Sequence, residues 1–193
     1  MLVSILCTSY KRFDRLLKMI DSVYETANPS NFEILVRLSL DDKEAICRKN
    51  ELGVYSEVKV IWGEQMRGYR DHYKMLTELL SHATGEWFHI IDDDMTIEGD
   101  GWDLNLEGFN GQTMFLTHEF YKLGPSLYGD GGSNGTGWIV PKKAWVVLGE
   151  KVMPDPPDIG MYQRLVKDNN WPHKWLNGST LVHDWQRPKD GGR

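Results

Sequence analysis

The 193-residue sequence lacks several features that mark whole classes of protein. It has only two cysteines, Cys7 and Cys47, and their spacing does not suggest a metal-binding motif, so we interpret both as free thiols. No apolar run approaches the ~20 residues that a membrane-spanning helix needs, and the N-terminus has no charged region followed by a cleavable apolar stretch. We therefore expect a cytoplasmic protein without stable membrane insertion.

An excess of basic residues is also missing. The 22 lysines and arginines face 28 aspartates and glutamates, which gives a formal net charge of -6, and the basic residues are scattered apart from a cluster within 11–18. Proteins that grip nucleic-acid phosphates non-specifically usually show a basic face, so the composition argues against that class. The glycine-rich segment 129–137 has no lysine at phosphate-loop spacing after it, which excludes a nucleoside triphosphatase of that type.

What remains is an ordinary globular composition, with 40% hydrophobic and 26% charged residues. The length suffices for one domain with a sizeable core. We expect a single domain over 1–193, with unequal halves at 1–98 and 99–187 and a loose tail at 188–193.

Apolar periodicity predicts alternating strands and helices in the first half. Runs of strand-forming residues predict strands at 2–7, 33–40, 58–62 and 87–91. Apolar residues at three- and four-residue spacing predict helices over 13–27 and 73–83. This alternation favours an α/β fold with a mostly parallel sheet flanked by helices, in which ligands bind beyond the carboxyl ends of the strands.

The second half, from about Gly99, is expected to be irregular. Strands are predicted at 114–117, 137–140 and 181–183. Pro141 is predicted to open a short helix that ends near Gly149, and a longer helix is predicted after Asp158.

The first-half strands end in polar residues. The apolar run 87–91 ends in three carboxylates, Asp92, Asp93 and Asp94, whose repulsion is costly unless water or a cation screens it. Hard oxygen ligands suit Mg²⁺ or Mn²⁺, although a solvated acidic turn is the alternative. Segments 8–10 and 41–42 fall at the same predicted edge.

Three of these segments together resemble family 2 glycosyltransferases of the GT-A fold. They are 3–12 (VSILCTSYKR), 33–42 (EILVRLSLDD) and 84–94 (TGEWFHIIDDD). The resemblance implies a single GT-A domain, with a nucleotide-sugar-binding half at 1–98 and an acceptor-side half at 99–187. It also implies a metal-dependent hexosyltransferase-type enzyme that moves a sugar from a nucleoside-diphosphate sugar, with UDP-sugars favoured, to an acceptor hydroxyl.

The same resemblance implies nucleotide-binding roles at the strand ends. The residues that would hold the base and ribose of the donor are Thr8, Tyr10, Arg12, Asp41 and Asp42. A positive side chain should also meet the diphosphate, because charge-assisted bonds to phosphate are strong. Arg67, Arg70 and Lys74 are the candidates, with Arg70 preferred, and each is alternatively a solvated residue at a helix start.

For the metal, Mn²⁺ or Mg²⁺, the resemblance implies a D-x-D motif made of Asp92 and Asp94. We expect Asp94 to be the direct ligand and Asp92 to meet the ribose or a metal-bound water. Asp93 points to the opposite face of an extended chain and should be structural. His183 is a third candidate ligand, which would favour Mn²⁺; the alternative is a surface histidine at a strand end.

The resemblance further implies an inverting reaction in which one carboxylate takes the proton of the acceptor hydroxyl. Asp158 is the expected general base and Asp155 the reserve. Asp158 precedes an apolar-periodic run, so a helix N-cap is the competing interpretation.

Two other functions fit the same residues. A nucleotidyltransferase acting on a sugar phosphate also needs strand-end carboxylates and metal, and a non-catalytic sugar-nucleotide or carbohydrate-binding domain would need neither a base nor turnover. The acceptor is left open between a glycan, a lipid-linked sugar, a protein and a modified nucleic-acid base.

Overall fold

The structure is a computed structural model that describes residues 2–65, 69–109, 111–123, 126–129, 137–145 and 162–184, without the side chains of 69–70 and 126–129. The strands are β1 (Val3–Ser9), β2 (Phe32–Ser39), β3 (Val58–Gly63), β4 (Trp87–Ile90), β5 (Met95–Glu98), β6 (Phe115–Leu123), β7 (Ser126–Gly129), β8 (Trp138–Pro141) and β9 (His173–His183). The helices are α1 (Phe13–Thr26), α2 (Lys43–Arg48), α3 (Tyr69–His82) and α4 (Trp102–Asn105). Single 3-10 or π-helical turns cover Pro29–Asn31, Lys49–Val54, Leu106–Phe109 and Gln163–Asp168.

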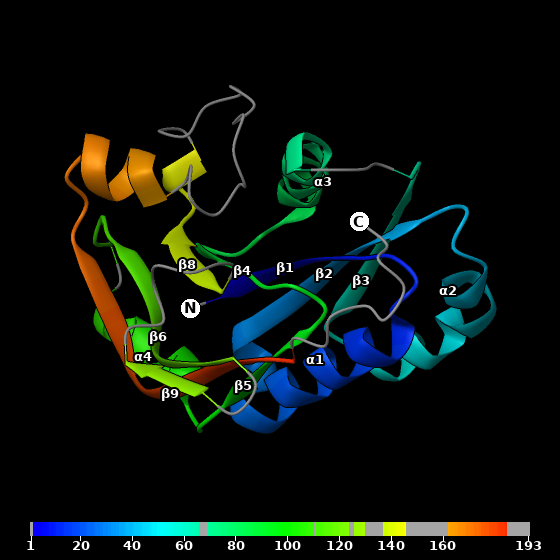
Figure 1. The fold of residues 1–193 in the computed structure, drawn as a ribbon, viewed down its shortest axis with the longest axis horizontal. Coiled ribbons are helices and arrows are strands. Elements are labelled where there is room, and N and C mark those ends of the chain that lie inside the picture. The colour runs from blue at the N-terminus through cyan, green and yellow to red at the C-terminus, as the bar shows by residue number, and fades with distance from the viewer. Residues whose placement is uncertain are drawn as a thin grey trace.

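These strands form one mixed sheet in the order β3-β2-β1-β4-β8-β6-β9-β5, and β7 pairs with β6 (Figure 1). The first four strands are parallel, with Val3 opposite both Phe32 and Trp87. All eight residues of β2 are buried, as expected for a parallel strand covered on both faces. The predicted parallel α/β sheet is confirmed for this half of the molecule.

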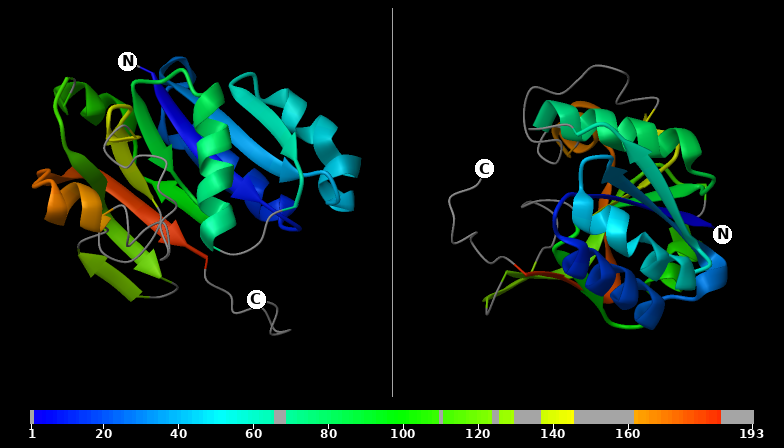
Figure 2. Two further views of the ribbon diagram at one scale, coloured as in Figure 1. Left: turned by 90° about the horizontal axis from the view of Figure 1, so that it is seen from above. Right: turned by 90° about the vertical axis from the view of Figure 1, so that its right-hand side faces the viewer.

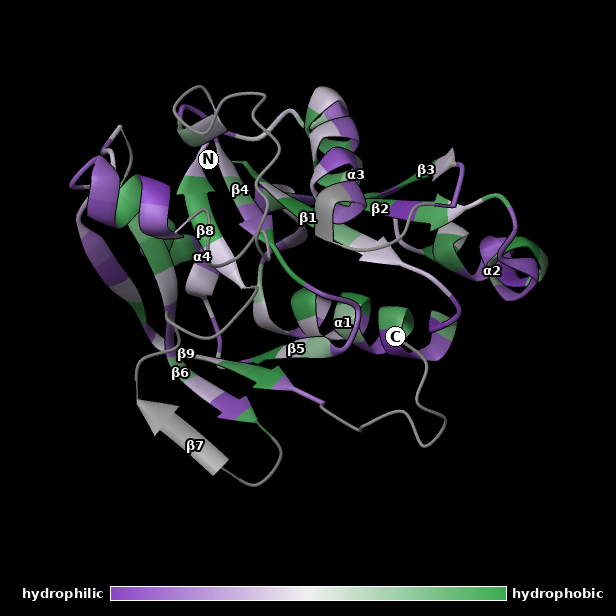
Figure 3. Ribbon diagram, turned by 45° about the horizontal axis from the view of Figure 1, so that its top comes forward, coloured by the Kyte–Doolittle hydropathy of each residue, from purple (hydrophilic) through white to green (hydrophobic). Residues whose placement is uncertain are grey.

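Helices cover both faces of the parallel strands. Figure 1 shows α3 on one side of the sheet and α1 with α2 on the other, and Figure 2 shows the same layers from two further directions. The apolar stripe of α1, including Leu16 and Ile20, packs under β1 and β2, whereas Leu76 and Leu79 of α3 pack on the opposite face. Figure 3 shows hydrophobic and hydrophilic residues on different sides of both helices, which is the pattern that predicted them.

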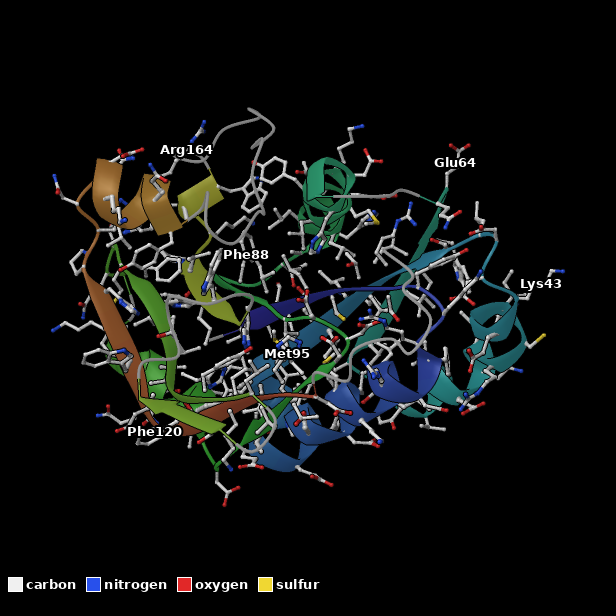
Figure 4. All side chains as sticks on the ribbon, viewed as in Figure 1. Lys43, Glu64, Phe88, Met95, Phe120 and Arg164 are labelled. Atoms are coloured by element: carbon white, nitrogen blue, oxygen red, sulfur yellow. The ribbon has the colours of Figure 1, made fainter. Side chains whose placement is uncertain are left out.

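The second half extends the sheet with strands of mixed direction. β8 runs antiparallel to β4, β9 runs parallel to β6, and β5 runs antiparallel to β9. Phe88 of β4 packs on the α3 side, and Met95 of β5 packs on the α1 side, as their places in Figure 4 indicate. Because β9 pairs with β5 on one side and β6 on the other, it connects strands from both halves of the chain.

Several predicted boundaries in the second half are wrong. Pro141 ends β8, and helical residues begin only at Ala144, with the remainder of the predicted helix outside the described residues. The strand predicted at 181–183 is the end of the much longer β9. The helix predicted after Asp158 is described only from residue 162 and contains a π-helical turn. Both cysteines are free thiols, as predicted, with Cys7 buried and Cys47 exposed. Within the described ranges, none of the helices has the length and apolar character needed to cross a membrane.

Candidate functional site

A cavity of about 560 Å³ lies at the carboxyl ends of the parallel strands, where the strand-end polar segments were predicted to meet. It is lined by Thr8, Ser9, Tyr10, Arg12, Ser39, His72, Met75, Asp92, Asp93, Asp94 and His183. The predicted residues Thr8, Tyr10 and Arg12 therefore share one cavity with the acidic run and with the end of β9.

The acidic run forms a tight turn after β4. The turn is closed by the amide of Met95, which donates to the carbonyl of Asp92 at 3.1 Å. Asp93 is 4% exposed and accepts hydrogen bonds from Ser9 Oγ at 2.7 Å and from Arg12 Nη1 at 3.1 Å. Burial raises the pKa of Asp93 to about 6, although the charge of Arg12 opposes this shift. Asp93 thus has partners within the protein, in line with the structural role predicted for it.

The carboxylate of Asp94 is surrounded by three basic side chains in the cavity. Its Oδ2 lies 3.0 Å from Arg12 Nη1 and 3.5 Å from Arg15 Nη1, and its Oδ1 lies 3.4 Å from His183 Nε2. Burial acts to raise the pKa of Asp94, but the hydrogen bond and charge of His183 and the two arginines lower it overall. Asp94 is therefore held as a carboxylate, which is the form that binds a cation.

The structure brings Asp94 and His183 together although 89 positions separate them in the sequence. His183 ends β9 and is paired with Met95 of β5, directly after the acidic turn. One carboxylate oxygen and one imidazole nitrogen suit Mn²⁺, and a divalent cation at a phosphate site typically takes its other ligands from phosphate and water. Among the described residues, no three His, Cys, Asp or Glu side chains are placed to hold a metal ion by themselves. The donor chemistry fits a cation that is shared with a diphosphate.

The two acids after β2 have different surroundings. Asp41 lies at the rim, where its Oδ2 is 3.3 Å from the hydroxyl of Tyr10. Asp42 is 2% exposed and accepts from the amide of Lys11 at 2.6 Å and from that of Ala45, in the first turn of α2, at 3.2 Å. Asp42 thereby caps α2 and holds Lys11 in a left-handed conformation with φ of 55°. Its described contacts position the loop that carries Tyr10 and Arg12.

One wall of the cavity comes from α3. His72 and Met75 line it, and so does Ser39 at the end of β2. None of the three was predicted as a site residue, although Ser39 ends a strand at the same edge as Ser9. Arg15 was noted only as part of the basic cluster within 11–18; it lies one helical turn after Arg12, and this spacing could have predicted that both reach the same carboxylate.

Of the remaining predicted residues, only Lys74 has a described side chain, and it does not line the cavity. Lys74 lies on the surface of α3, where its Nζ is 3.0 Å from Asp71. For Arg70 only the backbone is described. Arg67, Asp155 and Asp158 lie outside the described residues, so the diphosphate and general-base assignments stay predictions.

Comparison with known proteins gives a clear result for the fold. No family model and no curated protein matches the sequence. The structure of S. aureus TarS 1–349 in complex with UDP-GlcNAc superposes with a TM-score of 0.72 at 11% identity, covering 100% of this chain and 62% of that one. The mannosyltransferase PcManGT from Pyrobaculum calidifontis in complex with GDP-Man and Mn²⁺ gives 0.71 at 15% identity, covering 98% of this chain and 58% of that one.

The chain therefore has the GT-A fold of these glycosyltransferases, and the predicted fold is confirmed. It spans about 60% of the length of the two chains that it matches.

Proposed function

We propose that this chain is a metal-dependent glycosyltransferase that moves a sugar from a nucleoside-diphosphate sugar to an acceptor hydroxyl. The observation that carries the proposal is the cavity at the carboxyl ends of β1, β2 and β4, where Asp94, His183 and Arg12 meet. Two proteins of the same fold are described in complex with UDP-GlcNAc and with GDP-Man and Mn²⁺.

In this proposal Asp94 and His183 hold the cation, Mn²⁺ or Mg²⁺. The bound cation supplies Lewis-acid stabilisation of the leaving diphosphate, an effect of several kcal/mol. Asp92 lines the same cavity and meets the ribose or a water on the cation. The side chain of Arg12 is 44% exposed, so its guanidinium can turn from the carboxylates to the phosphate oxygens.

The nucleoside is assigned to the rim beside the loop after β1. Thr8 and Tyr10 line this part of the cavity, and Asp41 adds a carboxylate next to the Tyr10 hydroxyl. Ribose hydroxyls donate to carboxylates, which suits Asp41. A UDP-sugar is the favoured donor, and a GDP-sugar is the natural comparison.

The proposed reaction is a single displacement with inversion at the anomeric carbon. Asp158 takes the proton of the acceptor hydroxyl as the new bond forms. The Asp158→Asn variant should bind the donor normally and lose transfer. A product that keeps the donor's anomeric configuration by NMR would contradict this assignment.

Nucleotide binding by calorimetry tests the proposal most directly. We expect UDP or GDP to bind with Mn²⁺ and to lose most of that affinity on chelation or in Asp94→Asn. Asp168→Asn, which removes an exposed carboxylate that does not line the cavity, is the matched control. If no nucleoside diphosphate binds, or binding ignores both metal and Asp94, the proposal is wrong.

Product analysis separates the rival functions. A glycosyltransferase releases a nucleoside diphosphate from a sugar nucleotide, whereas a nucleotidyltransferase releases pyrophosphate from a nucleoside triphosphate. A binding domain would give neither product while still retaining the nucleotide.

A further inference from the structure

Tyr121 makes a contact with the candidate site that the proposed function does not use. It lies in β6, is 5% exposed, and its hydroxyl oxygen is 2.6 Å from Nδ1 of His183. In the parallel pairing of β6 with β9, Tyr121 stands opposite Leu181, so the phenol reaches diagonally along β9 to a residue two positions further on. Diagonal neighbours lie within reach of an aromatic side chain.

The other ring nitrogen of His183 faces the acidic turn. Nε2 is 3.4 Å from Oδ1 of Asp94, and the amide of Asp184 donates to the carbonyl of Asp94 at 2.9 Å. Strand pairing with Met95 and this bond fix the backbone of His183 beside the turn. They do not fix the rotation of the imidazole ring about its own bonds, which needs a contact to the ring itself.

We propose that Tyr121 is a positioning residue that holds the His183 ring with Nε2 directed at Asp94 and sets which ring nitrogen carries the proton. A phenol can both donate and accept a hydrogen bond. In the neutral ring, when Nε2 donates to Asp94, Nδ1 has a lone pair and accepts from the Tyr121 hydroxyl. When Nε2 gives its lone pair to a cation, Nδ1 carries the proton and donates it to the Tyr121 oxygen.

This second state rests on the proposed function, because it requires a cation shared by Asp94 and His183. Hydrogen-bond partners on the distal nitrogen of a metal-binding histidine orient the ring and strengthen the ligand, and their loss typically costs 10- to 100-fold in metal affinity. Tyr121 is in the right place for that role, since it contacts the nitrogen that faces away from Asp94.

The test is Tyr121→Phe in the full chain, which removes one hydroxyl and keeps the ring. We expect the dissociation constant for Mn²⁺, measured by electron paramagnetic resonance with saturating UDP, to rise about tenfold. Tyr24→Phe is the matched control, because it also removes a hydroxyl that is hydrogen-bonded to a side chain, Glu57 at 2.5 Å, away from the cavity. Unchanged Mn²⁺ affinity in Tyr121→Phe would overturn the proposal.

Nitrogen NMR of the His183 ring gives a second readout that a merely structural role would not move. In the wild-type chain without metal we expect one dominant tautomer with the proton on Nε2, and with Mg²⁺ and UDP the proton should move to Nδ1. Tyr121→Phe should give mixed tautomers. If metal-free wild-type His183 already shows mixed tautomers, the positioning role is wrong, even if the variant does not fold. If the wild-type chain binds no metal, the proposed function fails, and the metal-free spectra alone decide on Tyr121.

Discussion

Acidification should destabilise this protein through two buried histidines. His89 of β4 and His118 of β6 are 0% and 1% exposed, and their Nε2 atoms are 3.3 Å apart. Ser179 Oγ donates to the carbonyl of Leu176, so the hydroxyl accepts from Nδ1 of His118, which lies 2.9 Å away. With both rings neutral, Nε2 of His118 is then an acceptor for the N–H of His89, whereas protonation of both rings would set two N–H groups against each other.

The size of the effect follows from the pKa values. Burial lowers the pKa of His118 to about 3, and burial with the neighbouring His118 lowers that of His89 well below its usual range. In the unfolded chain both titrate near 6.5, so the unfolded state binds more protons below that pH and stability falls as the pH falls. At about pH 5 the His118 ring costs about 2 kcal/mol relative to pH 7.5, and His89 adds a loss in the same direction.

Other buried groups offset only part of the stability that the two histidines lose on acidification. The pKa of Asp93 is raised to about 6 in the folded protein. As the pH falls, Asp93 therefore takes up its proton in the folded state before it does so in the unfolded chain, and this stabilises the folded state by about 1 kcal/mol at pH 5. Hydrogen bonds from Lys59 and Ser4 outweigh burial and lower the pKa of Glu33 to about 2. Its stabilising effect is therefore lost only below about pH 4.5. A net loss of more than about 1 kcal/mol is therefore expected between pH 7.5 and 5, because His89 adds to the difference between His118 and Asp93.

Urea unfolding at both pH values, followed by tryptophan fluorescence, measures this loss. In His118→Asn, which keeps an N–H near Ser179, the loss should shrink by about 2 kcal/mol, whatever the stability at pH 7.5. His82→Asn removes an exposed histidine and should leave the loss unchanged. Equal pH dependence in the wild type and in His118→Asn would refute the reasoning.

Four substitutions test the local structure around the site and the sheet, each by its free energy of unfolding in urea. Asp42→Ala removes the cap of α2 and the acceptor for the loop after β1, and should cost about 2 kcal/mol. Gly63→Ala places a methyl group 2.2 Å from the guanidinium of buried Arg37, and should cost about 2 kcal/mol by breaking its hydrogen bonds. Gly99→Ala should cost more than Gly178→Ala, because both have positive φ but only the first meets a backbone carbonyl, at 2.1 Å; equal losses would contradict this.

The first half of the fold could be predicted because its signals are local. The stripe of α1 and the apolar runs of β1 and β2 each repeat over enough residues to show their period. By contrast, α2 has only six residues, which is too short for a helical period to emerge. In β9, the break at Gly178 and the irregular pairing near His118 disturb the alternation, so only its last three residues were predicted.

The candidate site also contains residues that a local sequence pattern could predict and residues that it could not. Carboxylates at strand ends predict a shared edge, and Asp92 and Asp94 do lie in one cavity with Thr8 and Tyr10. The contact between Asp94 and His183 depends on the order of strands in the sheet, which no local sequence pattern contains. His183 was predicted as a candidate ligand only because of the family resemblance. Asp42 shows the opposite case: the family resemblance gave it a place at the donor nucleotide, and its role as the cap of α2 could not be predicted because that helix was not.

The pairing of β9 ties the assembly of the cavity to the synthesis of the chain. β9 fills the gap between β5 and β6 and carries His183 to the acidic turn. A ribosome-bound chain that stops short of His173 would already encode the parallel strands and all three acids, yet leave the edges of β5 and β6 open. Open edges invite pairing with other chains, so a truncated product should aggregate, whereas the last described strand, once it emerges, pairs with both β5 and β6 and brings the imidazole to the acidic turn at the same time.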